Sequence, residues 1–254
     1  MEGNDAPNTS IVSSQQRESI LIRHIRYSDI SKIASIAATE YFDSDLNTFL
    51  CPRRHEYPHH VTRHFSQMIE TRFLNPRNIG FVAVKASKPQ EPLGYAQFIR
   101  LGNDRAALHL ISQQSSFWLT LQQWWSRIRI AVTNFIWPDR AVDRNAKREF
   151  LQSTELDMER YWMSPAMKAK YENRWHAQSV VVSSAYQRRG IGRLLMAEVL
   201  HRAQDEGVVV GLEASTEGEK LYRNLGFELR GPFSMIIGLS AGGIMMWTPA
   251  SSHL

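Results

Sequence analysis

The chain has 254 residues, of which 43% are hydrophobic, a formal net charge of +5 and one cysteine, Cys51. This length and apolar content suffice for one domain with its own core, and a single cysteine excludes an internal disulfide and suits a reducing compartment. The basic residues are dispersed among acidic ones, which argues against nucleic-acid binding. The nine histidines lack zinc-ligand spacing, so we expect no metal.

Residues 1–18 are polar and lack the apolar segment of a signal peptide, so we expect a flexible lead and a cytoplasmic protein. Alternating apolar and polar residues over 19–27 then predict a half-buried strand. Ser28 or Asp29 is expected to cap a helix. The next predicted elements are a helix over 61–74 and two paired strands, 79–85 and 93–100, joined by a turn at 87–92.

Residues 103–172 hold five of the seven tryptophans: Trp118, Trp124, Trp125, Trp137 and Trp162. Residues 113–136 are helical in period with an aromatic face, and 145–170 suggest a second, more charged helical stretch. One interpretation is a helical hairpin that caps the sheet edge, with its aromatic side chains in the core. The other is a lid in which Trp118, Trp124 and Trp125 line a substrate pocket, and both can hold at once.

A strand, a glycine turn and a helix follow each other between residues 179 and 206. The β-branched run at 179–182 predicts a buried strand, and the segment Gln-Arg-Arg-Gly-Ile-Gly at 187–192 leads into an amphipathic helix that Gly207 ends. A helix N-terminus offers free N–H groups and a partial positive charge, and glycines let an anion approach the main chain. We therefore expect a phosphate-binding turn.

Three nucleotide-binding motifs resemble this turn to different degrees. A P-loop requires Gly-Lys-Ser/Thr, but Ile191, Gly192 and Arg193 follow Gly190. A dinucleotide fingerprint requires a third glycine where this chain has Leu195. The segment closely resembles the acyl-CoA-binding motif of the GNAT superfamily of N-acetyltransferases, in which Gln187, Gly190 and Gly192 occupy the three fixed positions.

The downstream sequence strengthens this resemblance. Residues 208–212 predict a short buried strand, 219–225 a short helix, and Phe227 the start of another strand. The ending Leu-Tyr-x-x-Leu-Gly-Phe at 221–227 is similar to that of the family. Residues 232–247 are too short and too interrupted by glycine to span a bilayer, so we expect two strands with a turn at 240–243 and no membrane contact.

The resemblance implies an α/β fold: a central mixed, twisted sheet that splays between strands four and five, with helices on both faces. Residues 19–249 would form a single acetyltransferase domain, with the helical segment 103–172 inserted between strands three and four. The tryptophan-bearing insertion is similar to those of GNAT-like proteins of filamentous fungi.

The resemblance also assigns roles. Backbone groups of Val180, Val181 and Val182 would hold the acetyl carbonyl and pantetheine, and the turn would bind the phosphates of acetyl-CoA. The expected cofactor-binding residues of the turn are Gln187, Arg188, Arg189, Gly190, Ile191, Gly192 and Arg193. Tyr222 matches a family tyrosine that lies near the thioester and can protonate the leaving thiolate. His176 is the first candidate for the general base and Glu213 the second.

The function implied is transfer of an acetyl group from acetyl-CoA to the amine of a small molecule, by direct attack in a ternary complex. Two alternatives stay open: a protein or peptide N-acetyltransferase, and a non-catalytic acyl-CoA-binding protein. The expected partners are acetyl-CoA and a small amine, without metal, nucleic acid or membrane, and the protein would be a monomer or a homodimer.

Overall fold

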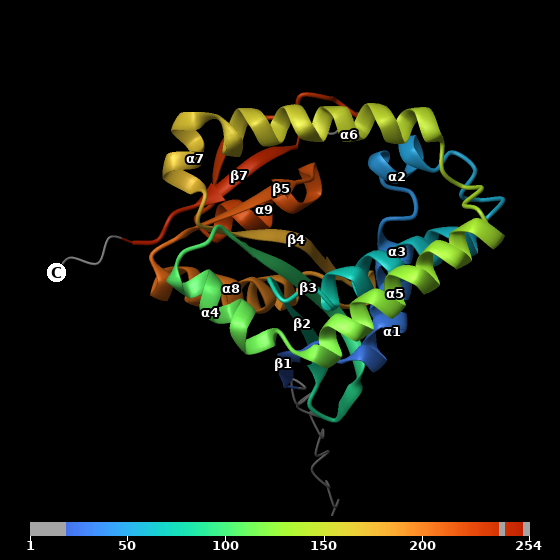
Figure 1. The fold of residues 1–254 in the computed structure, drawn as a ribbon, viewed down its shortest axis with the longest axis horizontal. Helices are drawn as coiled ribbons and strands as arrows, with labels where there is room; N and C mark the ends of the chain where they lie inside the picture. The colour runs from blue at the N-terminus through green and yellow to red at the C-terminus, as the bar shows by residue number, and fades with distance from the viewer. Residues whose placement is uncertain (1–18, 239–241, 251–254) are drawn as a thin grey trace, which may run out of the picture.

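The computed structural model describes residues 19–238 and 242–250. Its centre is a seven-stranded sheet in the order β1-β2-β3-β4-β5-β7-β6 (Figure 1). β4 and β5 pair in parallel, and every other neighbouring pair is antiparallel. The strands are β1 (Ile20–His24), β2 (Asn78–Lys85), β3 (Lys88–Leu101), β4 (Arg174–Val182), β5 (Val209–Ala214), β6 (Glu228–Pro232) and β7 (Gly243–Trp247).

Helices cover both faces of this sheet, as the sequence predicts. The helices of the first half are α1 (Ile30–Glu40), α2 (Asp45–Leu50) and α3 (Pro58–Phe73), and those of the second half are α8 (Ile191–Glu206) and α9 (Thr216–Asn224). Between β3 and β4 lie α4 (Arg105–Gln114), α5 (Phe117–Ile136), α6 (Arg144–Met158) and α7 (Pro165–Tyr171). The segment 103–172 is thus a helical insertion at the predicted place.

The two faces carry different packing clusters. On one face, α8 and Tyr222 of α9 pack against β2 to β5 through residues such as Leu195, Phe98 and Leu212. On the other face, α1 and α3 cover β2 to β4. The segment that links α6 to α7 covers β5 and β7 on that second face, since Val209, Ile244 and Met246 alternate with residues of the first cluster. Two clusters therefore share one face, side by side.

The sheet splays between β4 and β5. Parallel pairing runs from Arg174↔Val209 to Ala177↔Leu212 and then stops, although β4 continues to Val182. A register shift between Gln97 and Phe98 of β3 lies opposite this point and adds local twist to the strand pair. The expected splay is confirmed, and the last five residues of β4 have no partner on β5.

Three local expectations are wrong. The turn expected at 87–92 belongs to β3, which begins at Lys88, and register shifts flank Val84. Asp29 occupies the N-cap position of α1, but its side chain does not cap that helix: the buried carboxylate accepts hydrogen bonds from Arg26 N at 2.8 Å and from Arg23. Residues 233–238 are not a strand, because β6 ends at Pro232 and β7 begins at Gly243. Part of the turn expected at 240–243 lies outside the described residues.

The insertion divides into two parts. α4 and α5 form one arm, and α5 packs mainly against α3 (Figure 1). α6, α7 and the π-helical turn Glu159–Met163 form the other, which crosses from α2 to β6 and β7. Asp157 accepts hydrogen bonds from Ser234 N at 2.8 Å and Ser234 Oγ at 2.6 Å, which fixes this second arm to the loop after β6. Within the described residues, no helix has the length and apolar character needed to cross a bilayer.

Candidate active site

A histidine and a glutamate meet where β4 and β5 separate. His176 Nε2 lies 2.8 Å from Glu213 Oε2. His176 directly precedes Ala177, the last residue of β4 that pairs with β5, and Glu213 directly follows Leu212, the partner of Ala177. The His176 side chain is 10% exposed, whereas that of Glu213 is 45% exposed. The pair thus joins a buried imidazole to a carboxylate that faces solvent.

The rest of the imidazole is enclosed by the insertion. The ring of Trp162 lies edge-on to His176, with centroids 5.9 Å apart. A Cβ on Gly211 would lie 2.5 Å from Trp162 and 3.2 Å from His176 Nδ1, so only glycine leaves room for both rings. Within the described part of the chain, His176 Nδ1 is buried without a hydrogen-bond partner. A ring with no donor partner at Nδ1 favours the tautomer in which Nε2–H donates to Glu213.

Charges around Glu213 favour its ionised form. Burial opposes ionisation, but the electrostatic interaction and hydrogen bond with His176, together with the nearby Arg174, outweigh it and lower the pKa of Glu213. Arg174 is buried, and its guanidinium lies 4.4 Å from the centre of the Trp162 ring. Burial lowers the pKa of Arg174 to about 10, which still leaves this side chain positively charged at neutral pH.

Tyr222 lies on the opposite face of the sheet. It packs with Phe227 in the cluster of α8 and α9, with ring centroids 5.7 Å apart. Burial, and next the charges of Tyr41 and Glu213, raise the pKa of Tyr222, so the phenol keeps its proton at neutral pH. The tyrosine and the His176–Glu213 pair therefore flank the splay from its two sides.

A second buried group, which sequence reasoning missed, lies beside the unpaired end of β4. Arg72 of α3 donates to Ser179 Oγ at 2.7 Å. Burial lowers the pKa of Arg72 and raises the pKa of Tyr41 and of Tyr95. No sequence motif marks these residues, because they come from the C-cap of α1, from α3, from β3 and from β4, and meet only in the folded chain.

The glycine turn has the geometry of an anion site. Gly190 is the N-cap of α8 with φ +81°, and nothing lies within 4 Å of the position that its Cβ would occupy. This open space above the first N–H groups of a helix fits a phosphate. Gly192 has a different reason to be glycine, since a Cβ there would lie 3.0 Å from Leu221 of α9. Ile191 is buried in the α8 cluster.

Other residues of the turn are held by its neighbours. Gln187 Nε2 donates to Val182 O at 3.0 Å and to Glu40 Oε2 at 3.2 Å, and Glu40 Oε1 accepts from Ser184 N at 2.8 Å. Arg188 has φ +60°, which is uncommon for a residue other than glycine. The Arg189 guanidinium lies 5.2 Å from the ring centre of Tyr186. The three arginines of the turn and of the start of α8 are exposed: Arg188, Arg189 and Arg193.

The valines of β4 turn to alternate faces. Val180 and Val182 pack against the α8 cluster, and Val181 packs against the α1 and α3 cluster. Their side chains anchor the strand, so only their backbone groups are available to a ligand on the β5 side.

Comparison with known proteins agrees with this geometry. Residues 161–229, from the insertion through β4, α8, β5 and α9, match the model of the acetyltransferase (GNAT) domain. This segment of the chain is therefore similar to the GNAT acetyltransferase domain. No curated protein matches it by sequence. Solved structures are similar at low identity, and the mixed sheet with its parallel β4–β5 pair is the GNAT fold.

Two of these structures show how similar the solved structures are to this chain in sequence and in fold. A histone acetyltransferase HPA2 and related acetyltransferase from Corynebacterium glutamicum is 17% identical, with a TM-score of 0.57 over 93% of this chain and 99% of that one. The protein yncA from Salmonella typhimurium, solved with acetyl-CoA, is 16% identical, with a TM-score of 0.47 over 92% of this chain and 96% of that one.

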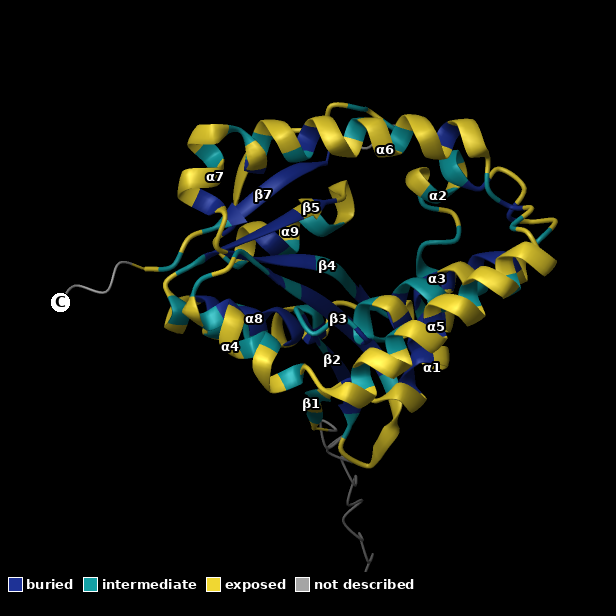
Figure 2. Ribbon diagram, in the orientation of Figure 1, coloured by how far each residue is buried: buried dark blue, intermediate teal, exposed yellow. Residues whose placement is uncertain are grey.

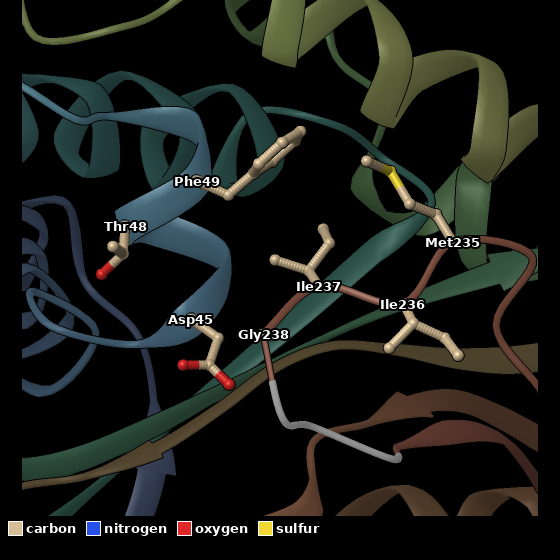
Figure 3. A pocket seen from close by; sticks show the side chains of 7 residues that line it. All are labelled: Asp45, Thr48, Phe49, Met235, Ile236, Ile237 and Gly238. Carbon is tan, nitrogen blue, oxygen red and sulfur yellow. The ribbon is translucent and has the colours of Figure 1, made fainter.

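A hollow of about 250 Å³ lies between α2 and the loop after β6 (Figure 3). Its lining is apolar apart from the side chains of Asp45 and Thr48 of α2. The other lining residues are Phe49, Met235, Ile236, Ile237 and Gly238. Figure 3 shows Phe49 and Ile237 entering it from opposite walls. The described lining does not include His176, Glu213 or Tyr222, so the hollow is separate from the site of these three residues.

The structure does not bring Trp118, Trp124 or Trp125 to this site. All three are exposed, at 70%, 60% and 62%, on α5, which α3 separates from the sheet. Neither interpretation of them, as core or as pocket lining, agrees with this placement. The insertion instead reaches the candidate active site through Trp162, which is 1% exposed. Among the described residues, no three His, Cys, Asp or Glu side chains gather as a metal site.

Proposed function

We propose that this protein transfers an acetyl group from acetyl-CoA to the amine of a small molecule, in a ternary complex. The observation that carries the proposal is the division of groups at the splay. A carboxylate–imidazole pair lies on one face, and a protonated tyrosine with an open glycine turn lies on the other. An amine and a thioester can therefore approach the same opening from opposite sides.

The chain's own residues suit the phosphates and pantetheine of acetyl-CoA. The first N–H groups of α8 have no acceptor within the helix, and Gly190 leaves their approach open. The exposed Arg188, Arg189 and Arg193 add positive charge near the turn. The backbone of β4 beyond Ala177 lacks a β5 partner, so it can pair with the amides of an extended pantetheine chain.

Glu213 is the general base in this proposal, and His176 positions it. The amine must lose a proton as it attacks the thioester carbonyl. Glu213 is the exposed member of the pair, whereas Nδ1 of His176 is enclosed by Trp162 and Gly211. The Nε2–H of His176 holds one carboxylate oxygen, and the other is free to accept the proton of the amine. In the sequence analysis, His176 was the first candidate for the general base and Glu213 the second.

Tyr222 supplies the proton that leaves with the thiolate. A phenol with a raised pKa is protonated at the start of each cycle. A thiol has a pKa of about 8.5, so an exchange with a tyrosine is feasible once the thioester bond breaks. The proton taken up by Glu213 and the proton given by Tyr222 then balance over the cycle through solvent.

The acceptor is proposed to be small and partly apolar. The hollow beside α2 is lined by Phe49, Met235, Ile236 and Ile237, which suits a hydrocarbon group. The arm α6–α7 closes over β5 and β7, which leaves less room for a peptide than a bare sheet would.

The test measures free thiol after incubation of the protein with acetyl-CoA and a panel of small amines, and identifies the product by mass spectrometry. We expect amine-dependent thiol release and stabilisation against heat by CoA, with little stabilisation by ATP or NAD. Acetylation of lysine peptides alone would instead assign a protein acetyltransferase. Stabilisation by CoA without any acetylated product would assign a binding protein.

A further inference from the structure

Helix α5 faces the protein with its polar side chains. Gln123 donates to Leu74 O at 2.7 Å, Ser126 donates to Glu70 Oε1 at 2.9 Å, and Arg129 forms an ion pair with the buried Glu70. Farther along, Asn134 and Gln67 exchange hydrogen bonds at 3.2 Å. Ser126 is the only residue of α5 that is fully buried. The helix is thus held to α3 mainly by polar contacts.

The opposite side of α5 is an exposed apolar stripe. Successive helical residues rotate by about 100°, so the large exposed hydrophobic residues fall within an arc of roughly 120°. They are Phe117, Trp118, Leu121, Trp124, Trp125, Ile128, Val132, Phe135 and Ile136. No polar residue interrupts this arc, and Figure 2 shows nearly the whole helix as exposed. Over 20 residues the stripe is about 30 Å long.

Such a surface is unusual for a protein exposed only to water. Soluble proteins place apolar stripes against their own core, and large exposed apolar patches mark contact with a partner or a membrane. Three tryptophans and two phenylalanines lie in the stripe. Amphipathic aromatic rings of this kind are enriched at the boundary between lipid and water.

The charged side chains of α5 itself are both arginines, and one of them, Arg129, is paired with the buried Glu70 of α3. Residues 105–138 contain Arg105, Arg127 and Arg129 but no lysine and no acidic residue. The helical rotation places Arg127 and Arg129 beside the two edges of the stripe. Basic residues that flank an aromatic face add attraction to anionic lipid headgroups.

The same charges disfavour a second copy of the chain as the occupant. Arg127 and Arg129 lie near the middle of the stripe, so two copies packed in either orientation would bring their arginines close together. Arg129 already pairs with Glu70 of its own chain, and α5 itself offers no carboxylate to a second copy. Like charges held this close destabilise an interface.

We propose that the α5 stripe docks this protein onto the surface of a membrane that contains anionic lipid. The helix would lie along the surface, because its apolar residues form one stripe rather than a full circumference. The expectation of no membrane contact considered only segments long enough to span a bilayer. It did not foresee that α5 would turn its aromatic face outward.

The test is co-sedimentation of the full-length protein with vesicles of phosphatidylcholine alone or with about a third phosphatidylserine. We expect stronger binding to the anionic vesicles, weakened by salt. Replacement of both Trp124 and Trp125 by Gln is expected to weaken binding about tenfold or more. Arg127→Glu is expected to weaken binding to anionic vesicles about tenfold and to leave binding to neutral vesicles unchanged.

Leu156→Gln is the matched control, because Leu156 is exposed at 62% on α6, on another side of the molecule (Figure 1). It is expected to bind vesicles as the wild type does. If the tryptophan variant melts lower, Phe135→Gln repeats the test at a position that is 88% exposed. Absent binding of the wild type, or equal binding of wild type and stripe variants, would overturn the proposal. A dimer that the stripe variants dissociate, without vesicle binding, would assign the surface to a second copy.

Discussion

His176 and Glu213 share one short hydrogen bond, 2.8 Å between Nε2 and Oε2, but only Glu213 reaches solvent. The parallel register of β4 and β5 produces this arrangement. His176 pairs with Gly211, and both His176 and Glu213 project to the face between the α1–α3 and α6–α7 clusters. Because Trp162 fills the space beside Gly211, the imidazole can act only through the carboxylate.

The first prediction separates the base from the residue that positions it. Glu213→Gln is expected to lower kcat/KM by about a hundredfold to ten-thousandfold, the share that general base catalysis supplies. His176→Gln keeps an N–H donor near the position of Nε2 and is expected to cost less than His176→Phe. Steady-state kinetics with acetyl-CoA and a responsive amine measure this, with Glu219→Gln on α9 as control. Equal losses for both His176 variants would contradict a positioning role.

The pH profile adds a readout that mere misfolding does not give. Burial raises the pKa of Glu213, and His176 is the main group that lowers it. In His176→Phe the burial effect dominates, so the pKa of Glu213 rises and the acidic limb of kcat/KM moves to higher pH. In His176→Gln the limb is expected to move less. An unshifted limb in His176→Phe would mean that another group accepts the proton of the amine.

The second prediction concerns the anion site. Gly190→Asp places a side chain and a negative charge where the phosphates are proposed to bind, and is expected to abolish stabilisation by CoA in a thermal-shift titration. Gly207→Asp is the matched control, because Gly207 also has positive φ, +65°, and open space, but lies at the other end of α8. Both substitutions are expected to destabilise the protein by about 1 kcal/mol, because each places a Cβ on a residue with positive φ. Loss of the CoA response in both would show strain rather than lost binding.

Much of the second half of the fold follows from local sequence. The glycine turn, helix α8 and strand β5 lie close to where they were expected, whereas β4 begins at Arg174, before the predicted run at 179–182. The splay was implied by family resemblance, and the β4–β5 register shows it. The short helix α2 escaped prediction because six residues give too little periodicity to detect.

The tryptophans show where sequence reasoning stops. The same helical period that identified α5 also indicated a buried aromatic face, since apolar stripes normally pack inward. Polar partners distant in sequence determine which face of α5 is turned toward the protein. The main one is Glu70, which accepts a hydrogen bond from Ser126 and pairs with Arg129. The side of a helix that faces the core is a tertiary property, and so is the choice of Trp162 as the buried tryptophan of the insertion.

The third prediction tests the proton donor. Tyr222→Phe is expected to lower kcat by about tenfold to a thousandfold with little change in CoA affinity, because only the hydroxyl is lost. Tyr171→Phe removes a hydroxyl from another buried tyrosine and is expected to leave kcat unchanged. Single-turnover rates measure the effect on the chemical step, and CoA titrations measure the affinity for CoA. A weakened CoA affinity with normal kcat would make Tyr222 a binding residue instead.

The fourth prediction is a pH-dependent stability. The Asp29 carboxylate is 2% exposed and accepts two hydrogen bonds from Arg23, at 2.6 and 2.9 Å. Burial raises the pKa of Asp29, but the bonds from Arg23 and Arg26 N outweigh it, so the pKa is lowered. This stabilisation is present above the unfolded-state pKa of about 3.9 and is lost as pH falls through the folded-state pKa.

Asp29→Asn is therefore expected to lower the free energy of unfolding by about 2 to 3 kcal/mol at pH 7, since it leaves a partly buried arginine unpaired. The difference from wild type is expected to shrink below about pH 4. Urea unfolding at several pH values measures it, with the exposed Asp205→Asn as control. A difference that stays constant down to acid pH would show that the charge of Asp29 is not the cause.

The last prediction compares two tryptophans of the same insertion. Trp162 fills the space against Gly211 and His176 and lies under the Arg174 guanidinium. Trp162→Ala is expected to cost about 3 to 5 kcal/mol of stability, because it opens a cavity and uncovers a buried cation. Trp124, 60% exposed on α5, is expected to change stability by less than about 0.5 kcal/mol when replaced by alanine.

The kinetic constants are expected to distinguish Trp162→Ala from Trp124→Ala as well. Trp162→Ala frees Nδ1 of His176 from its enclosure, so kcat is expected to fall even at temperatures where the variant is fully folded. Trp124→Ala is expected to leave kcat and both KM values unchanged, because α3 lies between α5 and the sheet. Melting temperatures measured beside the kinetic constants distinguish these outcomes. A raised acceptor KM in a stable Trp124→Ala protein would restore the interpretation of α5 as a lid over the acceptor.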